Sequence, residues 1–357
     1  MKATDEVLSY LEDEESKFIY QKKVEYSETG NFECIQEIAK RYLPMRKGGE
    51  YSPELENKMI DLLKDKKNII IFGCGASGKR IFDLLMMHGI AAECFVDNDS
   101  KKIGEYRGIA IRHPQEIDYR DVDAVVISQT YQFYVEQIHE QLEKLGVAKN
   151  TFLINYIDYA ARDFQWEQYF DPNIIKFGEK EIFVDAGALN LYTSKRFVEE
   201  CEKNSVKELK IYAFEPDEIS YRRCLEIKKS MSNVDLQLYN TGLWSRDCML
   251  NFIETGDGDS KITQEKAQVS IKAMSLDNCV SDEVTFIKMD IEGAELEALK
   301  GAEKIIKKYK PKLAICIYHK IEDLTEIPLY IKKLVPEYKF YVRHYSDSEC
   351  ETILYAV

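Results

Sequence analysis

The sequence predicts an α/β protein built of two doubly wound domains in series, preceded by a helical extension. Short β-rich runs alternate with helix-like segments from residue 67 onward, and the same alternation starts again at Glu181. Each of the two halves opens with a strand, a small-residue turn and a helix. A chain of 357 residues, 45% of them hydrophobic, is long enough for two domains of ordinary size.

The predicted boundaries divide the chain into four segments. Residues 1–66 form the helical extension, because apolar residues recur there at near-helical spacing among charged ones. No catalytic residue type stands out in this extension, which favours a docking role and a homo-oligomer formed through its helices. Residues 67–155 form the first domain and 181–357 the second. Between them, 156–180 carry aromatic and polar residues without a clear period, which indicates a linker.

The composition excludes several classes of partner. With 49 Lys and Arg against 63 Asp and Glu, the net charge is −14, which argues against nucleic acid and against an anionic membrane surface. No apolar run approaches the ~18 residues of a membrane span, and the polar N-terminus does not resemble a signal peptide. Nine cysteines without metal or redox spacing suit a reducing compartment, so we expect a cytoplasmic protein.

A glycine turn opens the first domain. Gly73, Gly75 and Gly78 fit G-x-G-x-x-G directly after a strand at 68–72 and at the start of a helix. Asp97 ends the next strand, at about the ~20-residue distance where an acid can bind ribose hydroxyls. The motif predicts a nucleotide site, with a ligand-free crossover as the alternative. The domain resembles the small nucleotide-sugar-binding domains of sugar-modifying enzymes, since it offers only one mononucleotide-binding half.

Two acids end successive strands of the second domain. Asp185 ends one strand and is followed by Gly187 and Ala188, and Glu215 ends the next. The carboxyl ends of parallel strands form the ligand crevice of such sheets, so both acids are candidate ligand residues. Further strands are expected at 236–240, 285–290, 312–318, 339–343 and 352–357, and a shorter pair at 249–253 and 269–273 flanks the polar stretch 256–259 like a hairpin insertion.

Residues 285–295 combine a strand with an acid-rich turn. Lys288 and Asp290 share one face of the strand, and Glu292 follows in the turn. Charges in a central strand are costly unless they are paired or used. A mutually satisfied Lys288–Asp290 pair is one interpretation, and a reactive site is the other.

At these residues the sequence resembles the FkbM-type methyltransferases, which use S-adenosylmethionine and have the class I fold. Residues 286–295 are similar to the family's K-x-D-x-E-G-x-E signature, and the segments around Asp185 and Glu215 to its two cofactor motifs. The resemblance covers roughly residues 165–357 and implies the strand order 3-2-1-4-5-7-6. It implies cofactor contacts to the methionine end from Asp185, Gly187 and Ala188, to the ribose from Glu215, and to the adenine from the stretch around Gly242.

The same resemblance brings Asp290 and His319 together, because they end neighbouring strands in that order. The candidate catalytic residues are Asp290, His319, Lys288 and Glu292. His319 could accept a proton from the acceptor as a base of near-neutral pKa. Alternatively, Asp290, Glu292 and His319 could hold Mg²⁺ or Mn²⁺.

The function that this resemblance implies is O-methylation of a sugar hydroxyl on a nucleotide sugar or glycan precursor. One alternative is an NAD(P)-dependent oxidoreductase that uses the first glycine turn. The other is a nucleotide-sugar-binding protein with an inactive methyltransferase domain. Its support is Leu191, which stands where many family members carry a second glycine and could crowd the cofactor.

Overall fold

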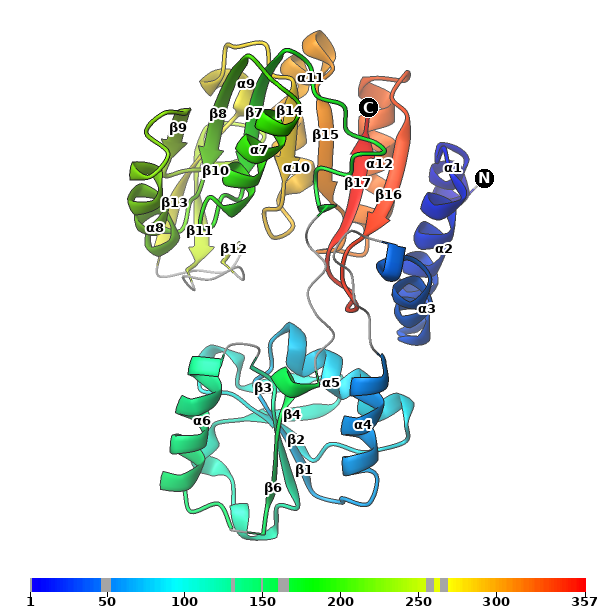
Figure 1. Cartoon of the computed structure of the whole chain (residues 1–357), viewed down its shortest axis with the longest axis vertical. Helices are drawn as coiled ribbons and strands as arrows, with labels where there is room; N and C mark the ends of the chain where they lie inside the picture. Colours follow the sequence, from blue (N-terminus) through cyan, green and yellow to red (C-terminus); the bar gives the residue numbers. More distant parts are fainter. Residues whose placement is uncertain are drawn as a thin grey trace. The chain divides into compact units, whose positions relative to one another are not determined.

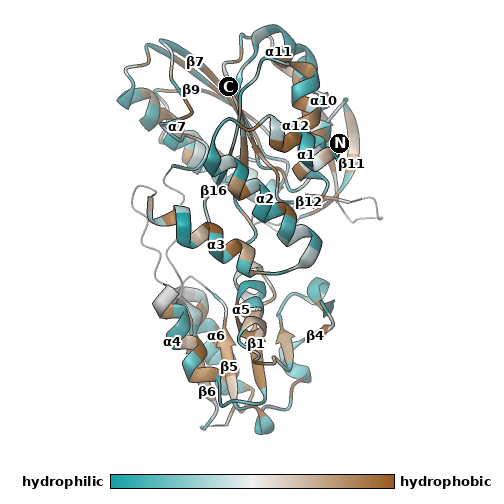
Figure 2. Ribbon diagram, turned by 90° about the vertical axis from the view of Figure 1, so that its right-hand side faces the viewer, coloured by the Kyte–Doolittle hydropathy of each residue, from teal (hydrophilic) through white to brown (hydrophobic). Residues whose placement is uncertain are grey.

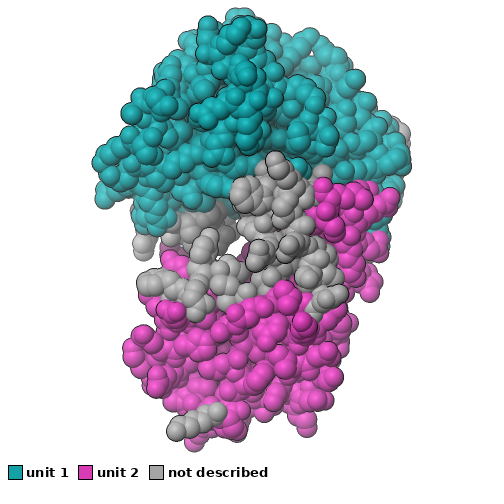
Figure 3. Space-filling model, in the orientation of Figure 1, with its two compact units in different colours: residues 1–27, 167–345, 351–357 teal, residues 28–166, 346–350 magenta. Residues whose placement is uncertain are grey.

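The computed structural model describes residues 2–45, 53–129, 132–148, 150–159, 167–254, 260–263 and 269–357 (Figure 1). They form two compact units, coloured separately in Figure 3. Unit 1 comprises residues 1–27, 167–345 and 351–357, and unit 2 comprises 28–166 and 346–350. The expected extension 1–66 is therefore divided between the two units and does not stand apart from them.

Unit 1 is built on a seven-stranded sheet. Its strands are β7 (Lys180–Ala186), β8 (Glu208–Phe214), β9 (Asp235–Tyr239), β14 (Phe286–Met289), β15 (Lys312–Cys316), β16 (Phe340–His344) and β17 (Thr352–Ala356). Their spatial order is β16-β17-β15-β14-β7-β8-β9. All pairs are parallel except those of β17, which runs antiparallel to both β15 and β16. In order of sequence this is 3-2-1-4-5-7-6, so the predicted class I fold is confirmed.

Helices and a second, smaller sheet complete the part of unit 1 after residue 167. The helices are α7 (Tyr192–Lys203), α8 (Glu218–Lys229), α9 (Leu276–Cys279), α10 (Glu295–Lys300), α11 (Glu303–Tyr309) and α12 (Asp323–Leu334). The small sheet has the order β10-β13-β11-β12, with β10 (Gly242–Leu243), β11 (Cys248–Ile253), β12 (Lys261–Ile262) and β13 (Val269–Met274). β11 and β13 pair antiparallel, as the expected hairpin requires. Residues 256–259 lie outside the described residues.

Residues 167–180 belong to the core of unit 1, which corrects their assignment to a linker. Tyr169, Phe170, Ile174 and Ile175 are each at most 6% exposed and pack in the same cluster as Phe183. The segment has no periodic pattern because it forms neither helix nor strand, yet its rings cover the sheet. Residues 160–166 of the expected linker lie outside the described residues.

The first 27 residues cover the free edge of β16. Leu11, between α1 (Ala3–Ser9) and α2 (Glu14–Thr29), forms a parallel bridge with Phe340. The hydroxyl of Ser16, in the first turn of α2, accepts a hydrogen bond from the amide of Val342 at 2.9 Å. Asp13 accepts from Arg343 at 2.7 Å. An unpaired edge is a site of unwanted strand pairing, and here the chain's own N-terminal segment occupies it. The buried side chains of α1 and α2 are thus used inside unit 1, and a homo-oligomer formed through these helices stays a prediction.

Unit 2 contains a six-stranded sheet with the order β3-β4-β2-β1-β5-β6. Its strands are β1 (Ile69–Phe72), β2 (Cys94–Val96), β3 (Gly104–Tyr106), β4 (Ile109–Arg112), β5 (Ala124–Ile127) and β6 (Phe152–Asn155), and only the edge strand β3 is antiparallel. The helices are α3 (Glu33–Tyr42), α4 (Pro53–Leu63), α5 (Ala76–Met87) and α6 (Gln132–Lys144). β1 and β5 are buried along their whole length and stand out as hydrophobic in Figure 2, as expected of central parallel strands.

A buried ion network lies beside α5 in unit 2. The Arg80 guanidinium is 2.5 Å from Glu56 and 2.9 Å from Asp347, and the side chains of Arg80 and Glu56 are each 3% exposed. Asp347 comes from the loop 346–350, which follows β16 in sequence.

Among the described residues, no helix has both the length and the apolar character needed to cross a membrane.

Candidate functional site

The carboxyl ends of β7, β8, β14 and β15 lie next to one another at one edge of the sheet of unit 1 (Figure 1). Asp185, Glu215, Asp290 and His319 lie at or just beyond these four ends. The topology therefore brings together the acids and the histidine that the sequence singled out.

Lys288 and Asp185 form a buried pair that supports the first turn. Lys288 Nζ lies 3.2 Å from Asp185 Oδ1 and donates to the carbonyl oxygens of Ala186 (3.1 Å) and Gly187 (2.7 Å). Ser194 donates to Asp185 Oδ2 at 2.7 Å. Burial opposes the charge of Lys288, but the carboxylates of Asp185 and Asp290 raise its pKa, so it stays protonated. With side chains 3% and 0% exposed, Lys288 and Asp185 form a buried pair that supports the turn, and their roles in catalysis and cofactor binding stay predictions.

Gly187 is required by the approach of two loops. It has φ +80°, and a Cβ at this position would lie 1.8 Å from the Asp290 carbonyl oxygen. Ala188, 3% exposed, follows it. Leu191 also has a left-handed backbone, with φ +56°, and its side chain is fully buried in the hydrophobic core cluster of unit 1. The expected crowding of the cofactor by Leu191 is therefore wrong, because the side chain packs inward at a backbone cost of ~1 kcal/mol.

Glu215 is a buried carboxylate with unused acceptor capacity. Its Oε2 accepts the amide of Leu189 at 2.7 Å and its Oε1 accepts the amide of Asp217 at 2.9 Å. Each carboxylate oxygen can accept a second bond. Burial raises the pKa of Glu215 to about 7, despite the two backbone donors. Gly242 lies nearby, since a Cβ there would be 3.8 Å from Pro216.

His319 lies among three carboxylates. Its Nε2 is 3.5 Å from Asp290 Oδ1 and 3.6 Å from Glu292 Oε1, and its Nδ1 is 3.0 Å from Glu295 Oε1. Burial would lower the pKa of His319, but Glu292, Glu295 and Asp290 raise it to about 11. An imidazolium has no lone pair to accept a proton, so this environment argues against the prediction that His319 is a base of near-neutral pKa.

Asp290 is held by two tyrosines that the sequence analysis did not assign. Tyr169 donates to Asp290 Oδ2 at 2.8 Å, and Tyr318 donates to Oδ1 at 3.3 Å. Burial opposes ionisation of Asp290, but Lys288 and His319 hold its pKa below the usual range. Tyr169 lies in the segment assigned to a linker, where no periodicity marked it. Tyr318 precedes His319 directly, which is the one signal that could have identified it.

Asp290, Glu292 and His319 can converge on one cation. One ligand atom from each residue lies within 4.8 Å of the other two. The turn that presents Glu292 has positive φ at Glu292 (+54°) and Gly293 (+86°). Two carboxylates and one imidazole suit Mg²⁺ or Mn²⁺.

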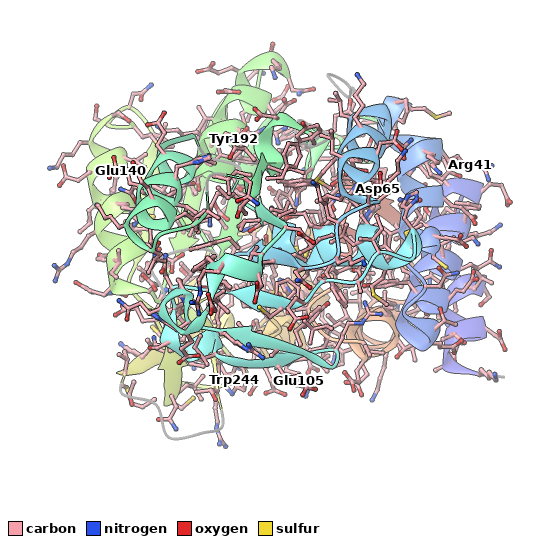
Figure 4. The ribbon with its side chains drawn as sticks, turned by 90° about the horizontal axis from the view of Figure 1, so that it is seen from below. Arg41, Asp65, Glu105, Glu140, Tyr192 and Trp244 are labelled. Carbon is pink, nitrogen blue, oxygen red and sulfur yellow. The ribbon has the colours of Figure 1, made fainter. Side chains whose placement is uncertain are left out.

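Exposed apolar side chains lie close to the site in sequence. Leu189 is 36% exposed directly after Ala188, and Tyr192, the first residue of α7, is 48% exposed (Figure 4). Ile321, two residues after His319, is 65% exposed. These surfaces can contact apolar portions of a ligand.

In unit 2, the residues of the glycine motif mostly serve the turn itself. A Cβ on Gly73 (φ +102°) would lie 2.3 Å from Ser128 Oγ, and one on Gly78 would lie 1.9 Å from the Gly73 carbonyl oxygen. Asp97 accepts the amide of Cys74 at 2.8 Å. Gly75 differs from the other two, because a Cβ there would meet no atom within 4 Å.

The strand order of the seven-stranded sheet and the acids at its strand ends define unit 1 as a domain of the class I methyltransferase type. Residues 185–340 match the model of the methyltransferase FkbM domain. Residues 65–153 match the model of the C2185-like N-terminal domain.

Three solved structures are similar to this chain to different degrees. The methyltransferase FkbM from Methylobacillus flagellatus KT has 18% identity and a TM-score of 0.49, over 92% of this chain and 98% of that one. An rRNA methylase from Streptococcus thermophilus has 16% identity and a TM-score of 0.33, over 50% and 86%. Aeropyrum pernix fibrillarin with natively bound S-adenosyl-L-methionine has 12% identity and a TM-score of 0.31, over 52% and 70%. These scores carry no inference about this chain, and no curated protein matches its sequence.

Proposed function

We propose that this protein is an S-adenosylmethionine-dependent O-methyltransferase that acts on a sugar hydroxyl, with unit 1 as the catalytic part. The observation that carries the proposal is Glu215, a 6% exposed carboxylate at the end of β8 in an FkbM methyltransferase domain. Each of its oxygens retains an acceptor position that a ribose hydroxyl fits.

The residues around Glu215 fit the other parts of this cofactor. Gly187 and Ala188 offer backbone without bulk beside the predicted methionine end, and Lys288 and Asp185 fix the path of that turn. Gly242, close to Pro216, lies on the predicted adenine side. S-adenosylmethionine, when bound, supplies a methyl group made electrophilic by a sulfonium.

The protein's own contribution is alignment of the acceptor. Fixed orientation of two reactants can contribute ~7–11 kcal/mol of a barrier. Of the three carboxylates around His319, Asp290 and Glu292 are 23% and 30% exposed, whereas Glu295 has no exposed side-chain surface. Asp290 and Glu292 are therefore the groups that can accept a hydrogen bond from the acceptor hydroxyl and hold it.

A divalent cation fits the same three residues. The His319 side chain is 9% exposed, and its Nε2 faces Asp290 and Glu292 without a well-aligned hydrogen bond among the described residues. Mg²⁺ or Mn²⁺ would displace the Nε2 proton of His319 to solvent and, when held by Asp290, Glu292 and His319, would polarise the acceptor hydroxyl.

Unit 2 would hold the nucleotide part of a nucleotide sugar. The supporting observation is the open space at Gly75, the N-cap residue of α5, where a phosphate can approach backbone amides. Nine free thiols suit a cytoplasmic enzyme of this kind.

Calorimetry of the full chain tests the proposal. Titrations with S-adenosylmethionine, NAD and a set of UDP-sugars should show binding of the first and of a nucleotide sugar. Binding of NAD in place of both would favour the oxidoreductase alternative. A chain that binds nucleotide sugars but not S-adenosylmethionine would be a binding protein with an inactive methyltransferase domain.

A further inference from the structure

We propose that Glu295 and Tyr169 are positioning residues that orient the cation ligands His319 and Asp290. The inference rests on the proposed cation site of Asp290, Glu292 and His319. It adds two residues that do not touch the cation, and it assigns the ring nitrogen of His319 that would.

Glu295 determines how the His319 ring is presented. It begins α10 and has no exposed surface. Its Oε1 lies 3.0 Å from His319 Nδ1 and accepts the amide of Ile291 at 2.9 Å. One buried oxygen thus accepts a hydrogen bond from the turn after β14 and lies within ion-pair distance of the ring after β15.

The opposite ring nitrogen faces the other two ligands. His319 Nε2 lies 3.5 Å from Asp290 Oδ1 and 3.6 Å from Glu292 Oε1. Histidines that bind metal ions almost always donate their second N–H to a carboxylate or carbonyl, which fixes the tautomer and the ring orientation. The geometry therefore assigns Nε2 to the cation and a protonated Nδ1 to Glu295.

Tyr169 plays the corresponding part for Asp290. Its hydroxyl donates to Oδ2 at 2.8 Å, which leaves Oδ1 on the side of His319. Tyr169 is itself fixed, because its amide donates to the Tyr355 hydroxyl at 2.9 Å and its backbone has φ +69°. A non-glycine residue with positive φ persists only where its surroundings determine it, and such residues are frequent at functional sites.

The test uses Mn²⁺ as the probe, with the full chain and its Glu295→Gln and Tyr169→Phe variants. Free Mn²⁺ measured by electron paramagnetic resonance gives the affinity directly, without any acceptor. Loss of such outer contacts costs 10–100-fold in metal affinity, and we expect each variant to lose about that much.

Matched controls lie elsewhere in unit 1. Tyr212→Phe removes a tyrosine hydroxyl that donates to Asp282 at 2.8 Å, and Glu181→Gln alters a 1% exposed carboxylate that pairs with Lys312. Both should leave Mn²⁺ affinity unchanged. Circular dichroism checks that every variant folds, and if Glu295→Gln does not, Tyr169→Phe and the tautomer measurement still decide the question.

A second readout tests the assigned nitrogen. In ¹⁵N-histidine-labelled protein saturated with Mg²⁺, the His319 signal, identified by its absence in His319→Ala, should show a protonated Nδ1. A purely structural role of Glu295 would not fix this tautomer, so protonated Nε2 would overturn the assignment.

The outcomes separate the levels of the proposal. Wild-type affinity for Mn²⁺ in both variants would overturn the positioning roles and leave the cation site intact. A wild type that binds S-adenosylmethionine but not Mn²⁺ would overturn the cation site and this inference together, and would leave the methyltransferase proposal standing. Absence of S-adenosylmethionine binding, measured separately by calorimetry, would overturn the proposed function itself.

Discussion

The two units contain the same turn built from different residues. In unit 2, Gly73 has φ +102° and faces Ser128 at the end of β5, while in unit 1 Gly187 has φ +80° and faces Asp290 at the end of β14. In unit 2, Asp97 after the second strand accepts an amide of the first turn, from Cys74, and its own i+2 amide at 2.9 Å. In unit 1, Glu215 likewise accepts an amide of the first turn, from Leu189, and the i+2 amide, from Asp217.

The difference between the turns lies in what the neighbouring strands add. Beyond β14 and β15, unit 1 presents Asp290, Glu292 and His319. In unit 2 the corresponding strand, β5, ends in Ile127, and the two described residues that follow it, Ser128 and Gln129, carry no ionisable group. A glycine turn with an acid after the second strand is therefore a structural device common to both units. The chemistry is specified by the following strands.

The largest expected effect on stability comes from a variant that disrupts the turn itself. Gly187→Ala places a Cβ against the Asp290 carbonyl oxygen in a left-handed backbone, and we expect unit 1 to lose ~3 kcal/mol of unfolding free energy. Denaturant unfolding followed by tryptophan fluorescence and circular dichroism measures it. Gly78→Ala should destabilise unit 2 comparably, since its Cβ would lie 1.9 Å from a backbone oxygen. A loss below ~1 kcal/mol in Gly187→Ala would show that the turn can rearrange.

The next effect separates the two acids by function. Glu215→Ala should weaken S-adenosylmethionine binding by ~1–3 kcal/mol, the cost of unpaired buried polar groups. Asp97→Ala, its counterpart in unit 2, should leave that affinity unchanged. Calorimetry of both variants gives the comparison, and equal losses would mean that Glu215 acts only through the fold.

A pH series sharpens the role of Glu215. Its pKa is raised by burial from 4.5 to about 7, so the free protein favours the protonated carboxyl below pH 7. The free energy of unfolding that this bound proton contributes is lost as pH rises through that range. Ribose hydroxyls donate to an ionised carboxylate, so binding favours the deprotonated form. Affinity for S-adenosylmethionine should therefore rise between pH 5 and 8, by up to ~1.4 kcal/mol per pH unit below the pKa. Glu215→Gln should remove the slope, and a slope that persists would have to come from another group.

The smallest effect on stability is expected at Gly75. This residue is extended (φ −93°, ψ −168°) with open space at the Cβ position, so Gly75→Val should change the unfolding free energy by less than ~1 kcal/mol. If the turn binds a nucleotide phosphate, the same variant should lose nucleotide-sugar binding and keep S-adenosylmethionine binding. Retained nucleotide binding in Gly75→Val would place the phosphate elsewhere.

The resemblance to the FkbM-type methyltransferases implied the strand order, and the apolar runs with their final acids predicted the residues at the ends of the strands. The sequence did not predict how those residues are used. Lys288 lies on the expected face, but its ammonium pairs with Asp185 and donates hydrogen bonds to two carbonyl groups. Tyr169 was missed because an irregular buried segment has no periodicity, and the charge state of His319 depends on a cluster assembled only by the fold.

The cover of β16 by residues 11–16 has a consequence for biosynthesis. Unit 1 pairs residues 11–16 with residues of β16 that are synthesised much later, whereas nearly all of unit 2 is complete by residue 166. Domains generally fold as they emerge, so most of unit 2 can form before any strand of the seven-stranded sheet has been made. Until residue 340 appears, Leu11 and Ser16 have no strand to pair with. Truncation of residues 1–27 would therefore expose an aggregation-prone strand edge while Asp290, Glu292 and His319 remain in the chain.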